Sequence, residues 1–198
     1  MKLLLQIACA FALSSPAMAE ANGFPRVEYR YGSVFDSQCA LTTSTTIAPE
    51  WLEELRVKMP AWQTQWNEQG TAVLQKTIDL TGRGFQQRDM IAAIFLCRRW
   101  TSMSIPLLVK GAWFLEGPSN GQPKSTDLLV GLTYHELLHT FVVENLEGRW
   151  PTPLIQEYSA ESPRTKNHLH VYAIMTAAKV FRKLSRHQWR LSSRHADH

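Results

Sequence analysis

The sequence predicts an α+β fold, and three features of its pattern indicate this class. Two stretches before residue 81 are typical of helices, two short apolar runs between residues 90 and 109 have the length of strands, and two longer stretches after residue 127 are again typical of helices. This order is expected when helices are segregated from a small sheet. We therefore expect one domain in which a short sheet is followed by two C-terminal helices.

The first 19 residues are typical of a secretory signal peptide. Lys2 supplies a positive start, residues 3–13 are apolar, and Ala17-Met18-Ala19 is a small-residue cleavage site. The apolar run is shorter than the roughly 20 residues that a membrane-spanning helix needs. We expect cleavage near Ala19, export to the periplasm or out of the cell, and a single mature domain over residues 20–198 without stable membrane insertion.

The first half of the mature chain is predicted to form an extended segment, then two helices and then two strands. Residues 20–47 are mixed and turn-rich, which predicts an extended segment. Pro49 suits the first position of a helix that runs to Leu55. A second helix is expected over residues 60–80, ended by Gly82. Residues 90–97 and 104–109 are the strand candidates, and Pro106 places the second one at a sheet edge because proline cannot donate to a ladder.

Two longer helices are predicted in the second half of the chain, after a loop over residues 116–125. The first covers residues 128–146 and ends before Gly148. The second begins at Pro163, with Ser162 as its cap, and runs to about residue 185.

Cysteine content and charge narrow the class of protein further. Removal of the signal peptide leaves Cys39 and Cys97, and an even pair in an exported chain predicts a disulfide. The formal net charge is +4, with many of the basic residues in the tail from residue 179 to 194. Such a run is typical of a solvated helix face, and no aromatic residues alternate with it, so nucleic-acid binding is not expected.

The segment with the clearest chemistry is His135-Glu136-Leu137-Leu138-His139, inside the helix predicted for residues 128–146. Histidines four residues apart lie on one face of a helix and can bind a single zinc ion. Glu136 is about 100° round the helix, where it can reach a zinc-bound water and take its proton. A buried helix would not normally carry these three side chains unless they were paired or ligated. Histidines satisfied by hydrogen bonds in a core are the alternative interpretation.

The ten residues LTYHELLHTF resemble the extended signature of the zincin metallopeptidases, in which uncharged residues flank HExxH. The preceding order of strand, edge strand and loop is also similar, and residues 157–174 resemble uncharacterised exported bacterial proteins of this type. The resemblance implies a small zincin-like domain with one Zn²⁺ ion, hydrolysis of a peptide or protein substrate, and substrate pairing along the edge strand of residues 104–109.

The third zinc ligand is not settled by this resemblance. The metzincin pattern needs glycine and histidine where this chain has Val142 and Asn145. The gluzincin pattern needs a glutamate on a following helix, for which Glu161 and Glu157 are available, although neither lies in the usual motif. His168 and His170 are the remaining candidates.

Helical spacing favours His170 as the third ligand. His170 begins an apolar stripe, and His168 projects nearly to the opposite face. The stripe consists of His170, Ile174, Ala177, Phe181 and Leu184. We therefore expect zinc between His135, His139 and His170, with Glu161 as the next choice and with His168 or Tyr172 as candidate donors to an oxyanion.

The sequence thus predicts an exported zinc-dependent hydrolase in which Glu136 is the general base and then the general acid. The alternative is a non-catalytic exported binding or envelope-assembly protein with a structural metal or none. A structural site has four protein ligands, whereas a catalytic site keeps one position open.

Overall fold

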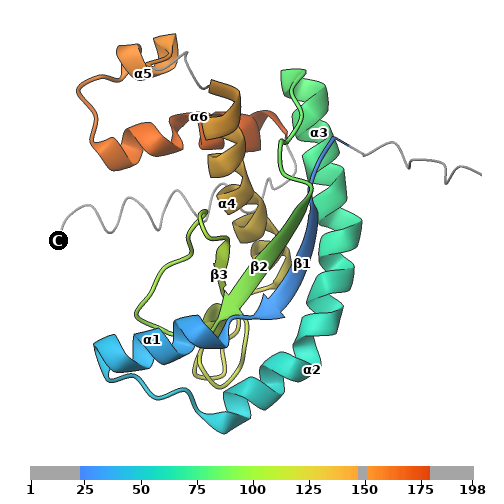
Figure 1. Ribbon diagram of the computed structural model, residues 1–198, viewed down its shortest axis with the longest axis vertical. Coiled ribbons are helices and arrows are strands. Elements are labelled where there is room, and N and C mark those ends of the chain that lie inside the picture. Colours follow the sequence, from blue (N-terminus) through green and yellow to red (C-terminus); the bar gives the residue numbers. More distant parts are fainter. Residues whose placement is uncertain (1–22, 147–150, 179–198) are drawn as a thin grey trace, which may run out of the picture.

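The computed structural model describes residues 23–146 and 151–178 (Figure 1). The predicted signal peptide, the end of the predicted last helix and the basic tail lie outside the described residues. The elements in chain order are β1 (Arg26–Tyr31), α1 (Ser33–Thr43), α2 (Pro49–Gln65), the π-helical segment η1 (Trp66–Gly70), α3 (Thr71–Thr81), β2 (Asp89–Phe95), β3 (Leu108–Lys110), the 3₁₀ turn η2 (Gly111–Trp113), α4 (Thr126–Leu146), α5 (Pro153–Glu157) and α6 (Pro163–Ala177). This confirms the α+β class.

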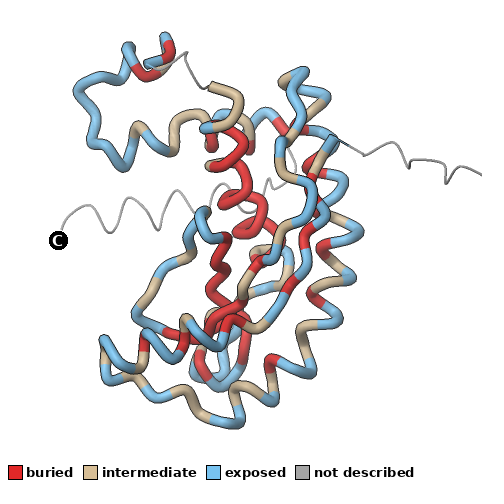
Figure 2. Tube along the Cα trace, viewed as in Figure 1, coloured by how far each residue is buried: buried red, intermediate tan, exposed pale blue. Residues whose placement is uncertain are grey.

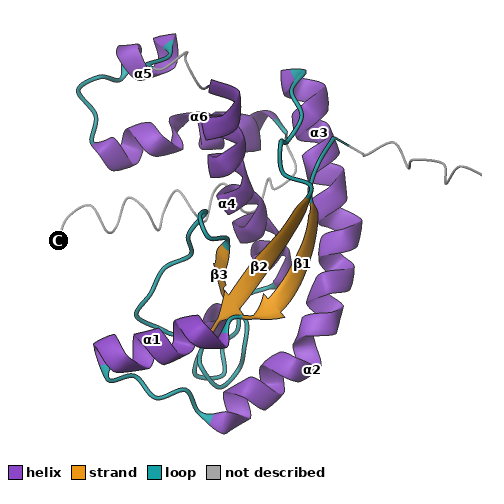
Figure 3. Cartoon of the chain, viewed as in Figure 1, coloured by secondary structure: helices purple, strands orange, loops and turns teal. Residues whose placement is uncertain are grey.

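A three-stranded parallel sheet, in the order β1-β2-β3, lies at the centre of the fold (Figure 3). β1 was not expected, since residues 20–47 were predicted to be an extended lead-in. Its residues alternate between the two faces, with Val27 and Tyr29 buried between exposed neighbours. That period of two is the pattern of a strand with one face on the core. α1 was missed as well, and it packs on β2.

The two predicted strands are present, and β3 lies at the edge of the sheet as Pro106 indicated. β3 is shorter than predicted. Residues 104–107 form a turn that includes a cis Ile105–Pro106 peptide bond, and Met103 pairs with Leu108 across that turn.

The two helices predicted before the sheet form one continuous helical arch along the β1 side (Figure 1). Pro60 lies inside α2 and does not end it. Buried residues on both sides of Pro60, including Leu55 and Trp62, keep the helix on the core. The arch ends at Gly82, as predicted, where a positive φ of 63° favours glycine and the Gly82 N–H donates to the Ile78 carbonyl.

α4 is the most deeply buried helix of the fold (Figure 2). Two hydrogen bonds between hydroxyl groups hold its middle in place. The Tyr134 hydroxyl pairs with Thr77 of α3 at 2.6 Å, and the Thr133 hydroxyl pairs with Tyr29 of β1 at 2.9 Å. These contacts fix the rotation of α4 and therefore the direction of the side chains that follow. None of the helices within the described residues is long and apolar enough to cross a membrane.

α6 packs against α4 near the C-terminal end of that helix (Figure 1). It begins as predicted. The Ser162 side chain accepts from the Thr165 N–H at 3.1 Å, and Pro163 occupies the first turn, where no N–H is needed.

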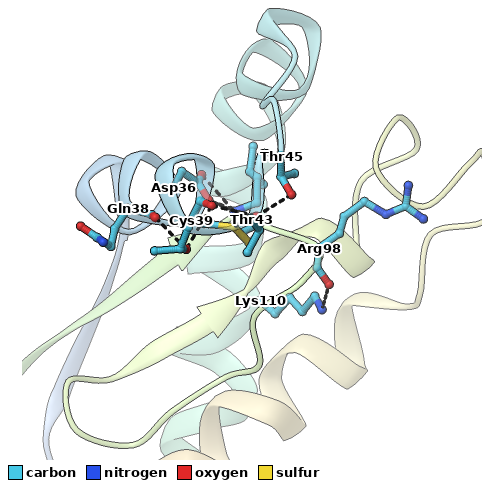
Figure 4. Close-up of a disulfide and its surroundings, with 10 residues drawn as sticks. Asp36, Gln38, Cys39, Thr43, Thr45, Arg98 and Lys110 are labelled. Atoms are coloured by element: carbon cyan, nitrogen blue, oxygen red, sulfur yellow. Dashed lines mark hydrogen bonds between the residues drawn. A yellow bond between two sulfur atoms is a disulfide. The ribbon is translucent and has the colours of Figure 1, made fainter.

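The predicted disulfide between Cys39 and Cys97 is present and joins α1 to the chain just after β2 (Figure 4). Both cysteines are fully buried. Beside them, the Asp36 carboxylate accepts the backbone N–H groups of Leu96 and Cys97, each at 2.8 Å. A buried disulfide is typical of proteins outside the cytoplasm.

Candidate metal centre

The two histidines of the HELLH segment lie one turn apart on α4, and their side chains converge. Their Nε2 atoms are 3.2 Å apart. His135 is 7% exposed and His139 is half-buried. The spacing of four residues therefore brings both imidazoles to one point, as the sequence predicted.

A third imidazole, that of His168 on α6, joins this pair. Each of the three side chains offers a ligand atom, and these atoms lie within 4.8 Å of one another. The His168 ring centre is 5.2 Å from that of His135 and 4.7 Å from that of His139. Among the described residues, no further histidine, cysteine, aspartate or glutamate belongs to the group.

The hydrogen bond of His168 determines which of its nitrogens can bind a metal. Its Nδ1 lies 2.8 Å from the backbone carbonyl of Arg164, which can only accept. Nδ1 must therefore carry a proton, which leaves Nε2 as the nitrogen that can bind a metal. Metal-binding histidines are commonly oriented by such a bond from their other nitrogen.

The expected third ligand, His170, lies elsewhere. Its Nε2 is 3.0 Å from the hydroxyl of Thr152, the residue that caps α5. The alternative candidates Glu157 and Glu161 are exposed and do not belong to the histidine group. The structure thus brings together His135, His139 and His168, and it does not bring His170 to them.

The reason is the rotation of α6 about its axis. The stripe that contains His170 was expected to be buried, but its member Ala177 is exposed. The face against α4 instead contains Val171 and Met175, which are 0% and 7% exposed. His168 precedes Val171 by three residues and so shares that face.

Glu136 is also buried, at 7% exposure, and its carboxylate accepts a hydrogen bond of 2.7 Å from the Ser104 hydroxyl. Burial raises the pKa of Glu136 to about 7, and the Ser104 bond opposes that rise. Near neutral pH the carboxyl group can therefore either take or give a proton. Ser104 lies 32 residues before Glu136, in the connection between β2 and β3, and no local motif in the sequence marks it.

The two histidines of α4 are held in the neutral form. Burial lowers the pKa of His135 to about 3, with smaller contributions from His139 and His168, and it lowers the pKa of His139 to about 4. A neutral imidazole is the form that binds a metal. His135 Nδ1 is buried and has no hydrogen-bond partner among the described residues.

These residues fit a zinc ion. Two imidazole nitrogens bound to one tetrahedral zinc at about 2.0–2.1 Å are about 3.3 Å apart, close to the separation of the two Nε2 atoms. Three neutral imidazoles are also the donor set of known catalytic zinc sites, which leave a fourth position open.

Tyr172 completes the surroundings on the side of α6. Its ring centre is 5.3 Å from that of His168 and 5.7 Å from that of His135. Burial raises the pKa of the Tyr172 hydroxyl, so the group keeps its proton and can donate a hydrogen bond.

Comparisons of the chain with protein-family models, with curated proteins and with solved structures gave no match.

Proposed function

We propose that this protein is an exported zinc-dependent hydrolase of zincin-like type that cleaves peptide bonds. The observation that carries the proposal is the convergence of His135, His139 and His168 beside the buried carboxyl group of Glu136. The signature around HELLH and the disulfide, which is typical of exported proteins, support the same assignment.

In this proposal the three histidines hold one Zn²⁺ ion through neutral imidazoles, and His168 replaces His170 as the third protein ligand. When bound, zinc supplies Lewis acidity, which acidifies water and polarises a carbonyl group. The part of the chain that the structure describes supplies three ligands, and a set of three favours a catalytic over a closed structural site.

Glu136 takes the proton of the attacking water and later gives it to the leaving amine. A group whose pKa is near the working pH is suited to both transfers. Ser104 holds one carboxylate oxygen of Glu136, so the other oxygen can face the water. Tyr172, which keeps its proton, is the candidate donor to the oxyanion that forms during attack.

The experiment is a comparison of zinc content and hydrolysis in matched variants. Elemental analysis of the purified protein should find one zinc per chain. His135→Ala, His139→Ala and His168→Ala should each lose the metal. His170→Ala is the control, and it should keep stoichiometric zinc because its ring lies at Thr152.

Glu136→Gln separates chemistry from metal binding. It should retain zinc, whereas hydrolysis in a quenched-fluorescence peptide library should fall on the order of 10²–10⁴-fold, the usual contribution of general-base catalysis. Zinc that survives all three histidine substitutions would rule out this centre. A parent protein that binds zinc without hydrolysing any peptide would instead support a binding protein with a structural metal.

A further inference from the structure

A second polar site lies at the other end of β3, where three cations line one cavity. The cavity has a volume of about 330 Å³, at the lower end of the range for small-molecule pockets. Its lining residues include Arg98, Lys110, Trp113, Gln122 and Lys124. None of them belongs to the histidine group, so this site is separate from the proposed metal centre.

Lys110 forms the inner wall of this cavity. It is only 6% exposed, and its ammonium group donates to the Arg98 backbone carbonyl at 2.7 Å (Figure 4). An ammonium group has three N–H donors, so this bond leaves two others for a ligand. Figure 4 shows the exposed Arg98 side chain extending away from that bond, and Arg98 is also one of the residues that line the cavity.

Trp113 holds the two lysines at the same place. The ammonium of Lys124 is 4.0 Å from the centre of the Trp113 ring, and that of Lys110 is 4.9 Å from it. The Lys124 N–H also donates to the Trp113 carbonyl at 2.8 Å, so the backbone fixes Lys124 beside the indole. The two charges are therefore positioned by contacts and are not merely neighbours on the surface.

These cations lack an acidic partner within the described residues. The ion pairs there involve Arg26, Arg30, Arg56 and Lys58, and none involves Arg98, Lys110 or Lys124. Burial lowers the pKa of Lys110, and repulsion from Lys124 and Arg98 lowers it further. A buried charge among like charges is unfavourable, and an anion in the cavity would offset all three.

We propose that this cavity binds a phosphate group, carried either by free phosphate or by a small phosphorylated molecule. A phosphate carries close to two negative charges and several strong acceptor oxygens, which match two lysine ammonium groups and one guanidinium group. The cavity also has room for a small organic group beside the phosphate. This inference does not depend on the proposed hydrolytic function.

The test is calorimetric titration of the full protein with inorganic phosphate and with glycerol phosphate at constant ionic strength. Lys124 is half-buried in the loop before α4. Lys124→Gln removes its charge from the cavity and should weaken phosphate binding at least fivefold. Lys110→Met should weaken it further, but the side chain is buried, so Lys124→Gln is the decisive variant. Lys76→Gln is the control, because Lys76 is exposed on α3 and does not line the cavity.

The affinities for inorganic phosphate and for glycerol phosphate distinguish a site for free phosphate from a site for a phosphorylated small molecule. Tighter binding of glycerol phosphate supports a phosphorylated small molecule, and equal binding supports free phosphate. The proposal is overturned if phosphate does not bind saturably, if acetate binds as tightly, or if Lys124→Gln and Lys76→Gln bind phosphate like the parent. The last result would also be expected of phosphate held at the metal centre.

Discussion

At the scale of single residues, the protonation state of each polar group in the centre follows from its surroundings. Burial keeps His135 and His139 neutral, and the Arg164 carbonyl fixes the proton of His168 on Nδ1. Burial also brings the pKa of Glu136 close to neutrality. The centre therefore combines two neutral imidazoles on α4 with one carboxyl group that can exchange a proton.

Ser104 is a positioning residue for Glu136, and its removal provides a sharp test. Ser104→Ala should leave zinc content unchanged, because the Ser104 hydroxyl donates to Glu136, which is not one of the proposed ligands. The kcat/KM for the best library peptide should fall on the order of tenfold, since a hydrogen bond to a charged group contributes about 1.5 kcal/mol or more. Ser104→Thr, which keeps the hydroxyl, should restore part of the loss. Parent-like activity in Ser104→Ala would show that the carboxylate needs no such support.

The sequence predicts some of these residues and not others. It predicts those that lie within one helical turn of each other, and it misses those that only the packing of distant segments brings together. His135, Glu136 and His139 are recognisable because one helix fixes their mutual geometry over a single turn. The choice of His168 depends on how α6 is rotated against α4, which short-range spacing does not determine. Ser104 comes from a loop that only the folded chain brings to Glu136.

At the scale of elements, the packing of α6 on α4 should govern metal affinity. Val171 is fully buried in this interface, one turn after His168. Val171→Ala should lower the free energy of unfolding by roughly 2 kcal/mol through the cavity it leaves. Zinc affinity should weaken several-fold, because His168 is then held less firmly.

Thr176→Ala is the matched control for this interface, since Thr176 is exposed on the same helix and should change stability by less than about 0.5 kcal/mol. Chemical denaturation and competitive zinc titration measure the two effects. Equal zinc affinity in both variants would mean that α6 does not need this contact to present His168.

β1 and α1 were not expected from the sequence, and the reason differs between the two elements. The strand RVEYRY has the alternating pattern of a half-buried strand, so a search for a period of two would have found it. α1 is harder to find, because one of its two buried residues is Asp36, and an aspartate is rarely buried. Both Asp36 and Cys39 are buried by contacts with the end of β2, which is distant from α1 in the sequence.

Asp36 joins α1 to the end of β2. Its burial leads us to expect a specific pH dependence of the free energy of unfolding. Burial raises the pKa of Asp36 above 3.8, although hydrogen bonds from Leu96, Cys97 and Tyr31 oppose the rise. A raised pKa in the folded state means that the fold binds the proton more tightly than the unfolded chain does. The stabilisation is thus fully present below the unfolded pKa and is lost as pH rises through the folded value.

The measurement for Asp36 is the difference in free energy of unfolding between the parent and Asp36→Asn from pH 4 to 7. Asparagine cannot titrate, but its oxygen can still accept from both N–H groups. The parent's stability relative to Asp36→Asn should fall with rising pH and then become constant. A difference that increases with pH would mean that the hydrogen bonds outweigh burial.

At the scale of the whole molecule, two links join elements that are far apart in the sequence, and each link acts on a different part of the fold. The disulfide links α1 to the end of β2, across 58 residues, and the proposed metal links α4 to α6. The cationic cavity lies on the side of the disulfide, since the carbonyl that binds Lys110 belongs to Arg98, the residue after Cys97. Loss of the disulfide should therefore affect global stability and this cavity, and it should leave the histidine group intact.

The contribution of the disulfide is measured on the metal-free protein, so that a reducing agent cannot change stability by binding or removing zinc. Replacing both Cys39 and Cys97 by serine should lower the free energy of unfolding by up to about 4 kcal/mol, because the bond restricts a loop of about sixty residues in the unfolded chain. Denaturant unfolding should show the parent with reductant approaching the double variant, and the double variant should not respond to reductant. Thiol counting on the denatured, non-reduced parent should find no free thiol from this pair. Two reactive thiols, or a double variant as stable as the oxidised parent, would mean that packing around α1 and β2 holds this region together without the covalent bond.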